Sequence, residues 1–184
     1  STIVNNAKVL SQLHAGKAIN AVPDMAYAML DSSSYDEQTL MRLADASEGN
    51  FEFNYTIDGL MIISRGKAAH ACECDKGFNA ATALIDLISH AYTTDDIGSI
   101  CSFINYAINM ETNGRSLGIK MSDSVSGPLT VNVGIVHIEG ETAKAQIDIR
   151  YPVTVNGDDV IKQFKKVAKN SDLKVEVLHL EKPL

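Results

Sequence analysis

The sequence predicts an α+β fold, in which antiparallel sheets carry helices packed on one face. Short apolar segments with strand character come in pairs joined by tight turns, and segments with helical spacing follow them. Strands joined in this way pair antiparallel, and helices then cover one face of the sheet. With 184 residues, 45% of them apolar, the chain is long enough for one large domain or two small ones.

The first pair of strands is expected over residues 7–13 and 25–30. Gly16 and Pro23 mark a structured turn between them. Proline has no amide hydrogen to give to a strand ladder, so Pro23 should lie where the second strand begins.

A helix and a hairpin are expected next. Ser34 and Glu37 have capping-box spacing, apolar residues follow at helical intervals, and Gly49 ends the helix. The hairpin has a strictly alternating strand, an Asp-Gly turn signal and a return strand, at residues 51–57, 58–59 and 60–64.

Two further helices are predicted over residues 78–92 and 97–110, and an irregular connection rich in Ser, Gly and Asp follows at 114–127. The second half then contains a strand, its antiparallel partner, an amphipathic helix and a last strand, at residues 129–138, 143–151, 158–170 and 173–180.

Charge and cysteine content exclude several classes of function. The net charge is −7 and no segment concentrates Lys and Arg, so neither nucleic acid nor an anionic membrane is expected as a partner. No apolar run reaches the ~20 residues that span a bilayer, and no secretory signal pattern opens the chain. An odd set of three cysteines favours the reducing cytoplasm. Both ends read as interrupted, so we expect a piece of a longer protein.

Read from its own residues, the chain lacks a catalytic centre. It contains no H-E-x-x-H, G-x-S-x-G, phosphate-binding loop or G-x-G-x-x-G motif. Four histidines lie within predicted strands or helices and have no carboxylate partner at ligand spacing, so they are interpreted as surface or structural residues: His14, His90, His137 and His179.

Three polar residues at unusual places remain as candidates. His70 lies in a tight connection between small residues and could donate to an oxyanion. Arg150 ends a strand and could grip a carboxylate, or could pair with Asp148 or Asp24 instead. Asn20 could bind substrate or simply form its turn.

A metal site is the alternative interpretation of the His70 region. Cys72 and Cys74 could hold a metal with His70, but a structural zinc site needs a second ligand pair, which the sequence does not show. The simpler interpretation is that both cysteines are small loop residues, and no metal ligand is assigned.

Four motifs in order resemble the dinuclear-zinc peptidase superfamily of aminoacylases, carboxypeptidase G, carnosinases and PepV-type dipeptidases. Residues 66–71 and 77–80 resemble its G-K-x-A-H-A…G-x-N-A signature, although Cys72-Glu73-Cys74 departs from the pattern between them. Residues 19–24 look like its N-x-V-P-D turn, and 148–152 look like its D-x-R-Y-P strand end, with a matching strand at 129–134. The motif order resembles the PepV-type dipeptidases over nearly the whole chain.

In that family these motifs belong to a lid inserted in the catalytic domain, whose zinc-ligand motifs this chain does not contain. The resemblance implies a lid spanning residues 1–184, with two ferredoxin-like halves at 1–112 and 113–184. It implies that His70 stabilises the oxyanion, that Arg150 holds the substrate carboxylate and that Asn20 binds beside them. Two zinc ions would lie in the missing catalytic domain and none in this chain.

The resemblance thus implies a zinc metallopeptidase that hydrolyses dipeptides, with this chain inactive alone and its own catalytic domain as partner. A stand-alone α+β binding or oligomerisation module is one alternative. The lid of an N-acyl-amino-acid amidohydrolase is another, because such relatives share the same lid motifs.

Overall fold

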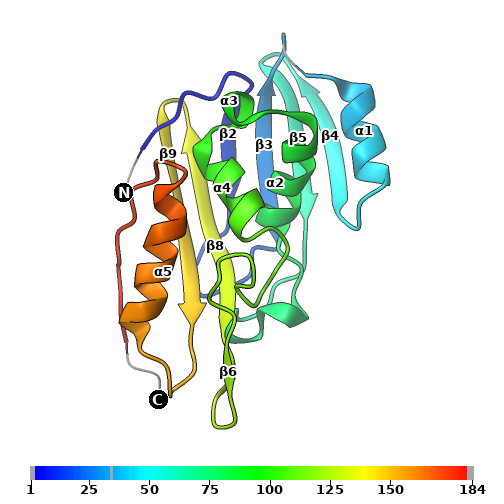
Figure 1. Cartoon of the computed structure of the whole chain (residues 1–184). Helices are drawn as coiled ribbons and strands as arrows, with labels where there is room; N and C mark the ends of the chain where they lie inside the picture. Colours follow the sequence, from blue (N-terminus) through cyan, green and yellow to red (C-terminus); the bar gives the residue numbers. More distant parts are fainter. Residues whose placement is uncertain (1–2, 34, 182–184) are drawn as a thin grey trace.

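A computed structural model describes residues 3–33 and 35–181, and Figure 1 shows the whole chain. Its main sheet has seven strands in the order β1-β9-β8-β2-β3-β5-β4, and every neighbouring pair is antiparallel. The strands of this sheet are β1 (Ile3–Val4), β2 (Leu10–Ala15), β3 (Met25–Asp31), β4 (Asn50–Thr56), β5 (Gly59–Arg65), β8 (Thr130–Glu139) and β9 (Thr142–Arg150). The pairing of β2 with β8 joins the strands of the two sequence halves in one sheet.

The helices lie on one face of this sheet (Figure 1). They are α1 (Glu37–Asp45), α2 (Ala80–Ala91), α3 (Thr94–Ile97), α4 (Ser99–Ala107) and α5 (Gly157–Lys169), with a 3₁₀ helix, η1 (Ala71–Lys76), before α2. The central helix α2 contacts β2, β3, β5 and β8, and nearly all of its residues are apolar or small. The α+β prediction, with an antiparallel sheet and helices on one face, is therefore confirmed.

The core lies between α2, α4 and the helix-facing side of the strands. Leu13, Ala28 and Ile62 are fully buried there and belong to β2, β3 and β5. Alternate residues on the same strands point to the opposite face, which carries no helix. The sheet therefore has one buried face and one open face.

Two local predictions were wrong in detail. Asp36, and not Ser34, caps α1, because its side chain accepts a hydrogen bond from the Thr39 amide at 3.1 Å; Ser34 itself lies outside the described residues. The helix predicted over residues 97–110 is divided at Gly98, whose positive φ of 87° ends α3 before α4 begins.

The last predicted strand, residues 173–180, does not form. This segment runs outside α5 (Figure 1), and a cavity of about 1080 Å³ separates it from β9. A strand requires a ladder of hydrogen bonds with a neighbouring strand, and the described strand pairs do not include residues 173–180. Among the described residues, β1 pairs with β9 only at Thr142 and Ala143.

A β-bulge in β8 brings the β2–β3 loop against the sheet. The register between β8 and β9 shifts between Val133 and Ile135, which leaves Gly134 as the extra residue. A Cβ atom at Gly134 would overlap the carbonyl oxygen of Ile19, and one at Gly16 would overlap the carbonyl oxygen of Gly134. Two glycines therefore permit the close approach of loop and strand.

A small hairpin of β6 (Ser122–Asp123) and β7 (Gly127–Pro128) projects from the end of the sheet. Asp123 fixes it, because its carboxylate accepts hydrogen bonds from the amide and hydroxyl of both Ser126 and Thr154. The Ser126 amide and these other donors lower the pKa of Asp123 far below its ordinary value.

Acid should release this hairpin only at unusually low pH. The pKa of Asp123 is lower in the folded chain than its ordinary value of about 3.9. Its contacts therefore stabilise the folded chain fully above pH ~4, and this stabilisation is lost as the pH falls through the lowered pKa. The Thr154 amide resonance, followed by NMR during acid titration, should shift with a midpoint well below pH 4. Asp123→Ala should abolish the transition, and a midpoint near pH 4 in the parent chain would contradict the assignment.

Candidate functional site

The turn that carries Asn20 and the connection that carries His70 are joined by main-chain hydrogen bonds. The Val22 amide donates to Ala69 O at 2.8 Å, and the Ala71 amide donates to Asn20 O at 3.0 Å. Ala21 and His70 form an isolated antiparallel bridge. The structure therefore places the Asn20 and His70 segments side by side, with both of these residues exposed.

Gly66 and Pro23 continue this junction toward α2. The Gly66 amide donates to Asp24 O at 2.8 Å, and the Ala80 amide donates to Pro23 O at 2.9 Å. A Cβ at Gly66 would overlap the carbonyl oxygen of Phe78, so the small residue is needed for this approach. The connection is as tight as its small residues predict.

A buried asparagine holds the turn on the sheet. The Asn132 amide nitrogen donates to Ile19 O at 3.2 Å and to Ala21 O at 2.9 Å, and Asn79 donates to its side-chain oxygen at 3.3 Å. Asn132 is 2% exposed, so these bonds are shielded from water. Asn79 also caps α2 by accepting from the Ala81 and Thr82 amides. One polar pair thus links β8, the Asn20 turn and the start of α2.

Asn132→Ala should destabilise the chain and loosen this turn. The substitution leaves two half-buried carbonyl groups without their donor, which costs about 1 kcal/mol or more. Urea unfolding should show this loss, and hydrogen exchange at the Val22 amide should become faster. Asn54→Ala, at an exposed asparagine of β4 outside the junction, is the control, and equal effects from both substitutions would contradict the proposed role.

The His70 side chain is held by Cys72. His70 is the N-cap of η1, its Nδ1 accepts from the Cys72 amide at 3.4 Å, and Cys72 Sγ lies 3.0 Å from the same nitrogen. An acceptor Nδ1 assigns the proton of the neutral ring to Nε2. The free edge of the imidazole therefore carries an N–H donor.

Cys74 does not join a metal site with His70 and Cys72. Its thiol is buried and points toward the carbonyl oxygen of Val131, 3.6 Å from Sγ. Burial raises the pKa of the Cys74 thiol, which disfavours the thiolate that a metal requires. These contacts support the interpretation of Cys74 as a small structural residue.

Arg150 forms an ion pair on its own strand. Its Nε lies 3.4 Å from Asp148 Oδ1, and the two side chains are 42% and 16% exposed. This pair is one of the two that the sequence left open. The hydrogen bond and the ion pair of Arg150 go to Asp148 and not to His70 or Asn20. Arg150 also lines the cavity along β9, as do Ile19 and Cys72. The structure therefore joins the Asn20 and His70 segments to each other, and it places Arg150 on a cavity that near sequence neighbours of both residues also line.

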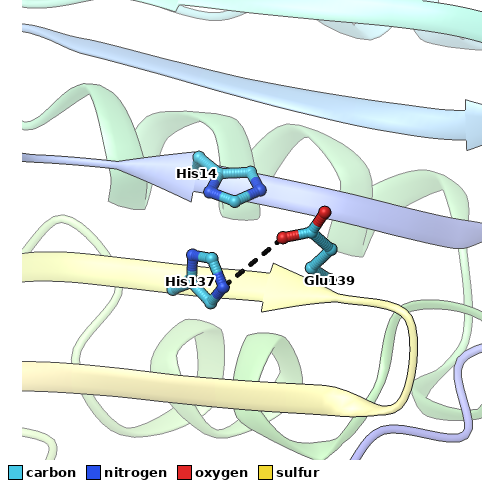
Figure 2. A group of neighbouring side chains, drawn as sticks. All are labelled: His14, His137 and Glu139. Atoms are coloured by element: carbon cyan, nitrogen blue, oxygen red, sulfur yellow. Dashed lines mark ion pairs between the residues drawn. The ribbon is translucent and has the colours of Figure 1, made fainter.

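Sequence reasoning missed a cluster on the open face of the sheet. Figure 2 shows His14, His137 and Glu139 together, at the adjoining strands β2 and β8. His14 and His137 are direct partners in the ladder, so each histidine gains a neighbour that no sequence spacing reveals. Burial and then the nearby His137 lower the pKa of His14, whereas Glu139 acts in the opposite direction.

The chain is similar to proteins named as dipeptidases. It is 28% identical over 169 residues to "Putative dipeptidase YtjP" of Bacillus subtilis, with 88% of this chain and 35% of that protein covered. It is 25% identical over 178 residues to a "Putative dipeptidase" of Staphylococcus haemolyticus, with 95% and 38% covered. A protein of the same description from Staphylococcus aureus strain USA300 is 22% identical over 173 residues, with 92% and 37% covered.

The chain is therefore an α+β domain with sequence similarity to part of proteins named as dipeptidases. It spans little more than a third of the length of these relatives, which fits one part of a larger protein. No family model matches the chain. Among the described helices, none is both long and apolar enough to cross a membrane.

Proposed function

We propose that this chain is the substrate-binding lid of a zinc-dependent dipeptidase of the PepV type. The observation that carries the proposal is the junction of the Asn20 turn with the His70 connection, which presents two exposed polar side chains on tightly held backbone. Similarity to about a third of longer proteins named as dipeptidases supports it. The catalytic domain that this lid serves would be the rest of the same protein.

His70 is the proposed transition-state donor. As a peptide bond is attacked, its carbonyl oxygen becomes an oxyanion, and a fixed N–H donor lowers the energy of that state. The Cys72 amide binds Nδ1, so Nε2–H is the atom that donates. His70 is exposed, which suits a group that must reach substrate on a facing domain.

Arg150 and Asn20 are the proposed binding residues. A guanidinium matches the two oxygens of a carboxylate, so Arg150 would bind the C-terminal carboxylate of the dipeptide. Without substrate, the ion pair with Asp148 holds the guanidinium at the end of the strand. The Asn20 amide would bind the substrate backbone beside it.

Two zinc ions would be held outside this chain. The His70 region does not fit a zinc site, because Cys74 is buried against Val131 O and the imidazole Nδ1 is engaged by Cys72. Zinc in the catalytic domain would polarise the carbonyl and activate water. The residues described here would orient the substrate and stabilise charge.

The test compares this chain with the longer protein that contains it. With dipeptides and zinc, the longer protein should show turnover and this chain alone should show none above background. Turnover by the chain alone would contradict the lid proposal. A panel that adds N-acyl amino acids separates a dipeptidase from an amidohydrolase, and a gene that ends near Leu184 would favour the stand-alone module.

Arg150→Met should weaken the binding of substrates that carry a free carboxylate. In the longer protein we expect KM for a dipeptide to rise by about tenfold or more, equivalent to ~1.4 kcal/mol per tenfold, with a smaller change in kcat. The corresponding dipeptide amide, which has no carboxylate, should be nearly unaffected. Lys144→Met, on the same strand and the same side, is the control, and equal losses for acid and amide substrates would contradict the role.

A further inference from the structure

The open face of the sheet carries a cluster with the composition of a metal site. His14 of β2 lies opposite His137 of β8 in the antiparallel ladder, and Glu139 follows on the same side of β8 (Figure 2). Their ligand atoms all lie within 4.8 Å of one another. Two imidazoles and a carboxylate are a common set of protein ligands for first-row transition metals.

The distances are suited to closure around one ion. Zinc binds imidazole nitrogen and carboxylate oxygen at about 2.0–2.2 Å, so two ligands of one ion lie roughly 3.3–3.6 Å apart in tetrahedral geometry. His137 Nε2 is 3.7 Å from Glu139 Oε2, and the two imidazole centroids are 4.4 Å apart. Small side-chain rotations would bring the three donors onto one ion without movement of the strands.

The surroundings hold the histidines but leave the donors accessible. Tyr27 of β3 stacks on the His14 ring with centroids 5.0 Å apart, which limits its motion. His137 is 35% exposed and Glu139 is 60% exposed at their side chains, so an ion can reach them from solvent. Lys144 faces His137 in the register of β8 with β9, but it is exposed and its long side chain can extend into water.

We propose that His14, His137 and Glu139 bind one divalent transition-metal ion, of the class of zinc, cobalt or nickel, on the open face of the sheet. This proposal differs from the sequence expectation that the chain binds no metal. Three protein ligands leave at least one coordination position for water or another group. Hard cations such as Mg²⁺, which prefer oxygen ligands, should not bind there.

The test is a metal titration of this chain without an affinity tag. Zn²⁺ binding is followed by competition with a chromogenic indicator, and Co²⁺ binding by its visible absorption, which reports tetrahedral nitrogen and oxygen ligands. The expected result is one ion per chain. His14→Ala and His137→Ala should each weaken binding by at least about tenfold, because even loss of an outer-shell partner weakens metal sites by about 10–100-fold.

Matched variants make the result decisive. Glu139→Gln changes an exposed carboxylate with the shape retained, and it should weaken binding even if a histidine variant fails to fold. His90→Ala is the control, because this imidazole bonds to Asp86 O on its own helix. Unchanged affinity in folded His14→Ala and Glu139→Gln would overturn the site. Loss of the bound ion in Cys72→Ser would also overturn the site, because it would place the metal on Cys72 and His70 instead.

Discussion

Replacing His70 with alanine in the longer protein is expected to lower kcat by ~10²–10³-fold, with little change in KM. This is the loss that follows removal of one oxyanion donor, because the oxyanion exists only in the transition state. The imidazole is exposed and lies against Cys72, which is also exposed, so the fold should be retained. Steady-state kinetics at saturating dipeptide measure the effect.

Two variants define the role of His70 more closely. His70→Gln retains a side-chain N–H donor and should recover part of the lost kcat if hydrogen bonding to the oxyanion is the function. His90→Ala removes an exposed histidine from α2 and should leave kcat unchanged. Near-normal activity in His70→Ala would show that the oxyanion donor lies elsewhere.

Gly134→Ala should cause a large loss of stability, because the added methyl group meets backbone atoms of the Asn20 turn. The new Cβ would overlap the carbonyl oxygen of Ile19 and lie 2.7 Å from its carbon, and both atoms are backbone that cannot rotate away. Relief requires the β2–β3 turn to leave β8, so we expect the free energy of unfolding to fall by about 1–3 kcal/mol or more. Urea unfolding measures this change.

The distinctive sign of Gly134→Ala is displacement of the Asn20 turn. Separation of Ile19 from β8 should break its bond with Asn132 and speed hydrogen exchange at Ala71, whose amide donates to Asn20 O. Gly140→Ala, at a positive φ of 54° with no atom within 4 Å, tests the backbone cost alone, about 1–2 kcal/mol. If the Ala71 amide exchanged at the same rate in Gly134→Ala as in Gly140→Ala, the proposed displacement of the turn would be contradicted.

Sequence patterns predicted most of the fold because its signals are local. The Asp58-Gly59 turn joins β4 to β5 as expected, with Thr56 opposite Gly59, and Pro23 lies just before β3. The segment at 173–180 has an equally good strand pattern but is not a strand in the structure, since strand formation depends on a neighbour that is distant in sequence. Local pattern indicates what a segment can form and not what lies beside it.

The candidate site shows the same division. Motif resemblance selected Asn20 and His70, and the structure brings their segments together through main-chain bonds that no side-chain pattern encodes. Motif resemblance could not reveal the approach of His14 to His137. These residues are 123 positions apart in the chain and meet through the β2–β8 ladder. Asn132 was also missed, because a polar residue within an apolar strand pattern gives no indication of its partners.

The bulge in β8, and a register shift in β2 between Leu10 and Gln12, change which residues of each strand face the core. In β8 the core-facing positions are Val131 and Val133 before the bulge and Val136 and Ile138 after it, a change from odd to even numbers. In β2 the register shift after Leu10 has the same effect, since Leu10 and Leu13 are both buried. If the side chains alternated without these shifts, His14 and His137 would point into the hydrophobic core. One additional residue in each strand therefore determines whether these imidazoles meet solvent or hydrocarbon.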